Sequence, residues 1–266
     1  MRAVGDPVVS PPGTDRAVQD AVIRALADAP YRASLEWRRL VLADPDRVER
    51  YARFLTRHFY HERIVQLFKY SRALARITGR RPEAVLKRAE FDALLPTAVL
   101  GSRETARAVA RLVVEYVGAA GTSIPFLGDL LRYEEAMMVV EAGPRVWRDA
   151  PQGAGGREQY APETVEGTVL LDLDYDLPAV LPKLLQPWTE LPQAPERPTK
   201  LLIARSAHGR VAVARSDDNL AAVMQLADGT RTLEELATGA GIDVGVLKET
   251  LQGLVDLGAV RFSTGS

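Results

Sequence analysis

The hydrophobic period changes once along this chain, and that change limits what the chain can fold into. Between residues 18 and 142 the apolar residues recur at spacings of three and four, which is typical of amphipathic helices. Residues 149–163, DAPQGAGGREQYAPE, carry three Gly, two Pro and no apolar period. After them, TVLLDLDYDL alternates apolar and polar residues, as a half-buried strand does. The pattern predicts an α+β protein in two parts.

The predicted parts have the following bounds. We expect a disordered leader over residues 1–17, an all-α domain over 18–148, a linker over 149–166, and a winged helix-turn-helix-like domain over 167–266.

Helix start and stop signals divide the first part. Asp44 and Pro45 form a helix start, with Asp as N-cap and Pro at the first helical position. This helix is expected to run toward a stop at Gly79, with a break near His58. Ser102 opens another helix, and a last helix is expected from about Pro125 to Ala142.

The second part reads as three strands and three helices, followed by a short closing strand. LLIARS-AHGR-VAVARS predicts a hairpin after the first strand. Asp217 starts one helix, Thr232 with Glu235 forms a capping box for the next, and Asp243 caps the third. AVRF at 259–262 looks like a closing strand. This order is the outline of a winged helix-turn-helix domain.

Composition and charge exclude several classes of protein. Lys and Arg number 34 against 35 Asp and Glu, a net charge of −1, so the surface as a whole is not built for nucleic acid. The absence of cysteine excludes disulfides, thiol catalysis and thiolate metal sites. No apolar stretch approaches the roughly 18 residues of a membrane span, and no signal peptide is evident. A cytoplasmic location is expected.

Two groups of residues suggest metal binding, and both have a simpler explanation. His58, His61 and Glu62 lie close in sequence, but the only other histidine, His208, falls in the hairpin turn. An amphipathic helix with polar histidines outside is favoured. The carboxylates Asp172, Asp174 and Asp176 share one strand face, where Mg²⁺ or Ca²⁺ is conceivable, but a solvated strand face is favoured. We therefore predict no metal, no cofactor and no catalytic set in this chain.

The distribution of charge in the second part favours a peptide ligand over DNA. The last helix carries Lys248 against Asp243, Glu249 and Asp256, and phosphate would repel it. An acidic peptide is a plausible ligand, because it could add a strand to an open sheet edge beside cations of the hairpin. Those cations are Lys200, Arg205, Arg210 and Arg215. The alternative is that these side chains only solvate the hairpin.

The helical half is basic. Residues 46–111 hold 15 Lys or Arg and 7 acidic residues, a net charge of +8. Such a bias indicates docking on an acidic protein surface or, less readily, on a nucleic-acid backbone. The acidic remainder of the chain could also balance it.

Two stretches carry a family resemblance. LADGTRTLEELA (226–237) followed by VLKETLQGLVDLGAV resembles the small domain that binds leader peptides of ribosomally made, modified peptides, similar to the peptide chaperone of pyrroloquinoline quinone biosynthesis. LGDLLRYEEAM (127–137), VLLDLDYDLPAVL and the hairpin resemble partner proteins of multinuclear non-haem iron-dependent oxidases, such as that of methanobactin biosynthesis.

The resemblance implies a non-catalytic subunit. Such a subunit binds the leader of a precursor peptide and presents a core cysteine to a separate barrel-type oxidase, which holds the iron. The leader is expected on the edge from Val211 to Arg215 and on the last long helix. The peptide-binding residues implied are Arg205, Val211, Ala212, Val213, Ala214, Arg215, Val244, Leu247, Lys248 and Leu251. A winged-helix DNA-binding regulator and a pure assembly adaptor remain the alternatives.

Overall fold

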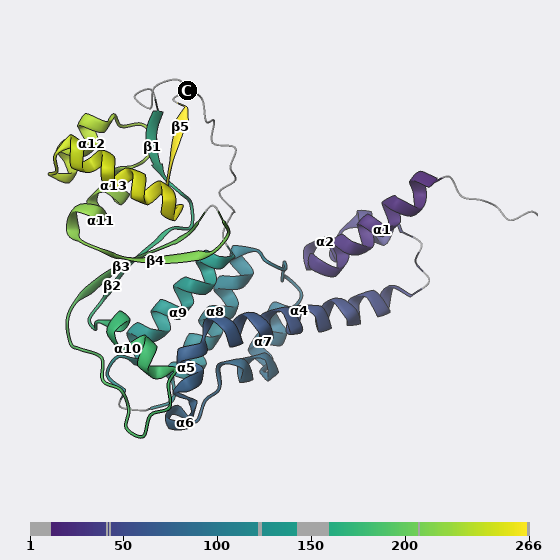
Figure 1. Cartoon of the computed structure of the whole chain (residues 1–266). Coiled ribbons are helices and arrows are strands. Elements are labelled where there is room, and N and C mark those ends of the chain that lie inside the picture. The colour runs from purple at the N-terminus through teal and green to yellow at the C-terminus, as the bar shows by residue number, and fades with distance from the viewer. Residues whose placement is uncertain are drawn as a thin grey trace, which may run out of the picture.

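The protein is a mixed α+β molecule, as the computed structural model in Figure 1 shows: a mostly helical N-terminal part is followed by small antiparallel sheets and helices. The expected α+β class is confirmed at this level. The structure describes residues 12–40, 42, 44–121, 124–142, 160–206 and 208–264.

The N-terminal helices form a main apolar core and, around Ala25, Tyr31 and Trp37, a separate smaller one. They are α1 (Pro12–Ala27), α2 (Ala29–Ala33), α3 (Leu35–Arg38), α4 (Pro45–Leu67), α5 (Lys69–Ala73), α6 (Ala75–Thr78), the 3₁₀ helix η1 (Pro82–Lys87), α7 (Ala89–Leu94), α8 (Arg103–Gly118) and α9 (Leu127–Glu141). The predicted caps of α4 and α8 are confirmed, because Asp44 accepts a hydrogen bond from the Arg47 amide at 2.8 Å and Ser102 accepts one from the Thr105 amide at 3.2 Å.

The break expected near His58 lies elsewhere. Helix α4 runs unbroken to Leu67, and the chain turns at Phe68 before α5. The first amides of α5 are satisfied from another helix: Glu134 of α9 accepts hydrogen bonds from Tyr70 N at 2.8 Å and Ser71 N at 3.2 Å. The prediction was wrong because the local pattern around His58 contains no information about this distant carboxylate.

The C-terminal part contains five strands and four helices among its described residues. They are β1 (Tyr160–Thr164), β2 (Val169–Leu173), α10 (Leu177–Leu184), β3 (Thr199–Arg205), β4 (Val211–Ser216), α11 (Asp218–Leu226), α12 (Leu233–Ala240), α13 (Val244–Leu257) and β5 (Val260–Thr264). The hairpin and the three helices were expected, and the capping box of Thr232 and Glu235 is present.

Two expected boundaries need correction. The predicted linker over 149–166 contains strand β1, which pairs antiparallel with β5 to form a two-stranded sheet. The Pro and Gly residues of the predicted linker indicated a loop, whereas β1 is a strand whose partner lies about a hundred residues away in the sequence. The predicted disordered leader also overlaps α1, which begins at Pro12. The remainder of the leader and residues 143–159 lie outside the described residues.

The three-stranded sheet is a wall shared by two cores. Its order is β2-β3-β4, with all pairs antiparallel. Along β3 the side chains alternate: Leu201 and Ile203 pack into the core of the helical half, whereas Leu202 and Ala204 pack into the core of α11–α13. Helix α9 contacts the first face. The core of the helical half therefore crosses the predicted domain boundary at residue 167.

A buried carboxylate of α9 fixes the end of β2 to the helical half. Asp129 is 6% exposed, and its Oδ2 accepts hydrogen bonds from Asp174 N at 2.7 Å and Tyr175 N at 3.0 Å. Asp129 and Glu134 both belong to the stretch LGDLLRYEEAM. These two carboxylates are thus structural anchors between segments far apart in the sequence.

Within the part of the chain that the structure describes, no helix combines the length and the apolar character needed to cross a membrane.

Candidate peptide-binding site at the sheet edge

Strand β4 is an edge strand, because within the described residues its one partner is β3. The hairpin closes with a hydrogen bond of 2.8 Å from Ser206 N to the Arg210 carbonyl oxygen. In an antiparallel pair the hydrogen-bonded and non-hydrogen-bonded positions alternate. Counting from this bond, the backbone N–H and C=O of Val211, Val213 and Arg215 point away from β3. The edge therefore offers donors and acceptors to an added strand.

The side chains of β4 divide between the two layers. Val211, Val213 and Arg215 pair with Arg205, Ile203 and Leu201, so they face the helical half, and Val211 packs against its core. Val213 stays 38% exposed. Ala212 and Ala214 face α11–α13 and are half-buried. The predicted edge residues therefore form one continuous strip, with an apolar side chain accessible at its centre.

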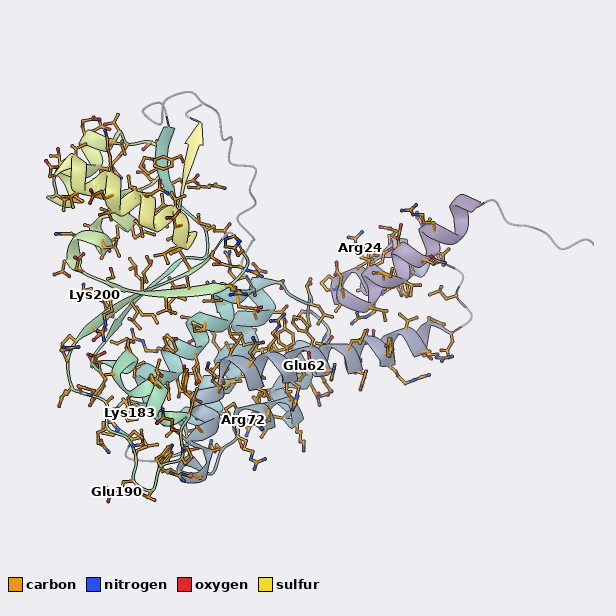
Figure 2. All side chains as sticks on the ribbon, viewed as in Figure 1. Arg24, Glu62, Arg72, Lys183, Glu190 and Lys200 are labelled. Atoms are coloured by element: carbon orange, nitrogen blue, oxygen red, sulfur yellow. The ribbon has the colours of Figure 1, made fainter. Side chains whose placement is uncertain are left out.

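The hairpin cations are less available than expected. Lys200 Nζ lies 3.3 Å from Asp172 and 2.9 Å from Asp218, and hydrogen bonds to these carboxylates raise its pKa. Lys200 lies at one end of the sheet (Figure 2). Arg215 pairs with Asp176 at 2.6 Å, and Arg205 Nε donates to the Gly209 carbonyl at 3.4 Å. Lys200 and Arg215 are therefore not free to form a strongly cationic peptide-binding surface. The backbone groups at the edge of β4 are better placed to bind a peptide.

Asp176 departs from its predicted place on a solvated face. Its side chain is 2% exposed, and it binds the guanidinium groups of Arg197 and Arg215. Burial raises the pKa of Asp176, but the hydrogen bonds from Arg215 and Arg197 outweigh it and hold this pKa below its usual value. Asp172 and Asp174 are exposed, as expected. Asp176 therefore joins the end of β4 to the connection between α10 and β3.

We expect Asp176→Asn to lower the free energy of unfolding by about 2 kcal/mol near pH 7, because two charge-assisted hydrogen bonds lose their charged acceptor. Since folding lowers this pKa, the stabilisation is present above the unfolded value of about 3.9 and is lost as pH falls through the folded value. Urea unfolding measures both effects. The exposed neighbour Asp174→Asn is the control, with an expected change under about 0.5 kcal/mol. Equal effects of the two variants would contradict the role of Asp176.

Helix α13 contributes less of the predicted site. Leu247 and Leu251 are 0% and 1% exposed and belong to the core of α11–α13, so they have no surface to offer a peptide. Their stripe packs inward because it is the core-facing stripe of an amphipathic helix. Val244 is half-buried and Lys248 is exposed. These two keep their place as candidates.

The C-terminal end of α13 lies directly beside the hairpin. A Cβ atom at Gly258 would lie 2.2 Å from the Arg205 carbonyl oxygen, so only glycine permits this approach. The left-handed conformation at Gly258, with φ of 77°, imposes the same choice. The close approach fixes α13 against the end of β3.

A cavity that the sequence did not indicate opens beside Arg205. It has a volume of about 320 Å³ and lies between α4, α9 and the end of β3. Phe59, Tyr60 and Met138 supply apolar surface, and an ion pair of Arg63 with Glu141 lines its polar side. Its residues come from segments so far apart in sequence that no local motif could reveal it.

The histidines of α4, His58 and His61, are exposed to solvent. His58 Nε2 lies 3.3 Å from Glu62, both side chains are exposed, and the His58 ring stacks on Phe54 with centroids 6.0 Å apart. Among the residues that the structure places, no group of three or more His, Cys, Asp or Glu could hold a metal ion.

The edge of β4 is thus the best-formed candidate site. It can bind an extended peptide backbone through hydrogen bonds, with side-chain contacts toward the helical half and toward α11–α13. A scan against protein-family models and a search of curated proteins find no match to the chain.

Proposed function

We propose that this protein is a non-catalytic subunit that binds the leader of a ribosomally synthesised precursor peptide. The leader adds a strand to the β4 edge and pairs with the outward backbone groups of Val211, Val213 and Arg215. The observation that carries this proposal is the edge of β4, which has no second partner strand among the described residues and carries the partly exposed Val213. Strand addition to such an edge is a general mode of peptide recognition.

The order of elements supports the proposal. Three antiparallel strands, β2, β3 and β4, precede α11, α12 and α13, with α10 inserted between β2 and β3. This is the order of the leader-recognition domains that LADGTRTLEELA and its following helix resemble. We propose that this region has a winged helix-turn-helix-like arrangement used for peptide rather than DNA. Lys248 and Val244 of α13 are its candidate contacts on the second layer.

The chemistry is assigned to a partner. Following the resemblance to partner proteins of multinuclear iron oxidases, we propose that a separate barrel-type enzyme holds the iron and modifies a cysteine of the core peptide. This chain, in the cytoplasm, then presents that peptide and contributes no catalytic residue or cofactor.

A DNA-binding regulator is the second candidate, favoured by the order of helices alone. Against it, α13 presents exposed acidic side chains, among them Glu249 and Asp256, where phosphate would have to bind. Affinity for a generic DNA duplex across salt concentrations tests this candidate, because phosphate contacts weaken steeply as salt rises.

Affinity purification of this chain, co-expressed with the products of its neighbouring genes, tests the proposal. Mass spectrometry is expected to recover a barrel-type iron oxidase and a short cysteine-bearing peptide. Recovery of the chain alone, together with retardation of duplex DNA, would replace the proposal with the regulator. A complex that survives disruption of β4 with unchanged peptide modification would indicate an assembly adaptor instead.

A further inference from the structure

The positive charge of the helical half is concentrated in one segment. Residues 69–88, KYSRALARITGRRPEAVLKR, hold seven Lys or Arg and one Glu, a net charge of +6. The wider stretch 46–111 has a net charge of +8, so most of its surplus lies here. Elsewhere in that stretch many arginines have carboxylate partners, such as Arg53 with Glu49 and Arg57 with Asp92.

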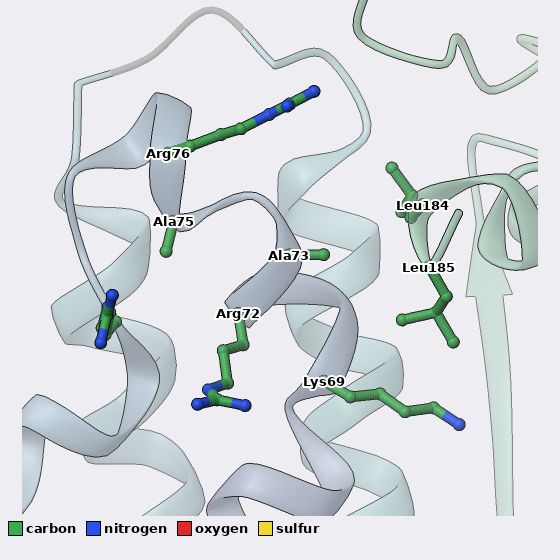
Figure 3. Close-up of a pocket in the computed structure, with 8 residues that line it drawn as sticks. Lys69, Arg72, Ala73, Ala75, Arg76, Leu184 and Leu185 are labelled. Atoms are coloured by element: carbon green, nitrogen blue, oxygen red, sulfur yellow. The ribbon is translucent and has the colours of Figure 1, made fainter. Parts of the chain in front are cut away.

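This segment lines a groove against the end of α10. The groove has a volume of about 540 Å³. Lys69, Arg72, Arg76 and Arg81 line it, and none of its described lining residues is a carboxylate. Figure 3 shows Ala73 and Lys69 pointing toward Leu184 and Leu185 across the groove. Leu185 is 49% exposed, so the groove combines cations with an accessible apolar wall.

The cations of the groove are only partly neutralised by the protein itself. Arg72 lies 3.2 Å from Glu83, the one acidic residue of the segment. Arg76 is oriented by Trp188, since its guanidinium carbon lies 3.2 Å from the ring centroid and one nitrogen donates to the Trp188 carbonyl oxygen. Its remaining N–H groups form a fixed fork, the geometry that binds a carboxylate well. Arg81 is exposed.

The groove fits an acidic polypeptide better than a nucleic acid. Single-stranded nucleic acids bind through stacking of bases on free aromatic faces. Here a face of Trp188 is already covered by Arg76. A duplex would present a convex, wholly polar backbone to a concave site, leaving Leu185 without a partner. An acidic segment that also carries an apolar residue satisfies both walls.

We infer that the groove between α5–α6 and the end of α10 binds an acidic segment of a partner protein. This segment also contains an apolar residue such as leucine. The inference is independent of the peptide edge at β4, because it uses other residues and another surface. Carboxylates of the segment pair with Arg76, Arg81 and Lys69, and its apolar residue covers Leu185.

Fluorescence anisotropy with the full chain tests this inference. The probe is a short labelled peptide in which Asp and Glu alternate with Leu, and the comparison peptide carries Asn and Gln instead of the acids. Binding of the acidic probe is expected to weaken with salt, since the screening length shortens to about 8 Å at physiological ionic strength. Loss of the acids from the probe is expected to abolish binding.

A double variant, Arg76→Gln with Arg81→Gln, locates the site. It is expected to weaken binding of the acidic probe about 5- to 30-fold, the effect of losing two partly exposed ion pairs. The matched control, Arg39→Gln with Arg107→Gln, removes the same charge from exposed positions elsewhere and is expected to leave affinity unchanged. Arg81→Gln alone, which leaves the contact between Arg76 and Trp188 intact, serves if the double variant melts early.

Three outcomes would overturn the inference. The first is equal weakening in the groove variant and the matched control, which would reduce the effect to net charge. The second is failure of the acidic probe to bind. The third is preferential binding of a labelled DNA duplex that the groove variant abolishes. None of these outcomes affects the peptide site at β4, which is tested separately.

Discussion

Replacement of Glu134 by Ala is expected to lower the free energy of unfolding by about 3–5 kcal/mol. The carboxylate is 0% exposed and accepts hydrogen bonds from Tyr70 N, Ser71 N and the Ser71 hydroxyl. Alanine leaves these buried donors unsatisfied and removes the acceptor that begins α5. Chemical denaturation measures the loss. Glu135→Ala on the same helix removes only a half-buried carboxylate 3.9 Å from Arg111 and is expected to cost under about 1 kcal/mol.

Glu134 also makes stability depend on pH. Burial raises its pKa to about 8, against the opposing effect of the hydrogen bonds from Ser71 and Tyr70. Because the folded pKa lies above the unfolded value of about 4.3, the stabilisation is complete below that value and is lost as pH rises through about 8. Glu134→Gln, which keeps an acceptor for the Tyr70 and Ser71 amides, is expected to flatten this part of the pH profile. A wild-type profile with no loss between pH 5 and 8 would show that Glu134 is ionised in the folded protein.

The second large effect is expected at the sheet edge. Val213→Pro should weaken binding of the recovered precursor peptide by about tenfold or more. It removes one outward N–H, worth about 1 kcal/mol, and its ring obstructs the approaching strand. The β3–β4 ladder keeps its hydrogen bonds, because Val213 occupies a non-hydrogen-bonded pair with Ile203. Isothermal titration calorimetry measures the affinity.

Val213→Ala is the matched control for that experiment. It keeps the outward N–H and removes only methyl groups of a side chain that is 38% exposed, so a loss below about fivefold is expected. If Val213→Pro and Val213→Ala lower the affinity for the peptide equally, the Val213 side chain and not the backbone edge determines binding. If proline leaves the affinity unchanged while the protein stays folded, strand addition at β4 is ruled out.

Local signals in the sequence predicted the local parts of the structure. Asp44, Ser102, Thr232 and Asp243 each cap the helix that was expected of them, since a cap depends on amides two or three residues away. The hairpin was found for the same reason, because its turn and its alternation lie within sixteen residues. The hairpin alone does not make the Val211–Arg215 strip an edge; that position was expected from the family resemblance, and it depends on β1 and β5 pairing with each other and not with β4.

The contacts between distant segments were not predictable in the same way. The 160–164 segment becomes a strand only because β5 pairs with it, and the turn at Phe68 depends on a carboxylate of α9. Leu247 and Leu251 show the same limit for the candidate site. An apolar stripe in a sequence does not reveal whether it faces a ligand or the protein's own core.

The sheet β2–β4 is shared by both cores, and this sharing has a consequence for unfolding. A fragment cut between the two halves would leave Leu201 and Ile203 facing water, so the halves are expected to melt in a single cooperative transition. Under the proposed function, a peptide strand added at β4 would widen a sheet that packs against α9 on one face and against α11–α13 on the other. We expect such a strand to stiffen the helices on both faces of the sheet, without any hinge having to move.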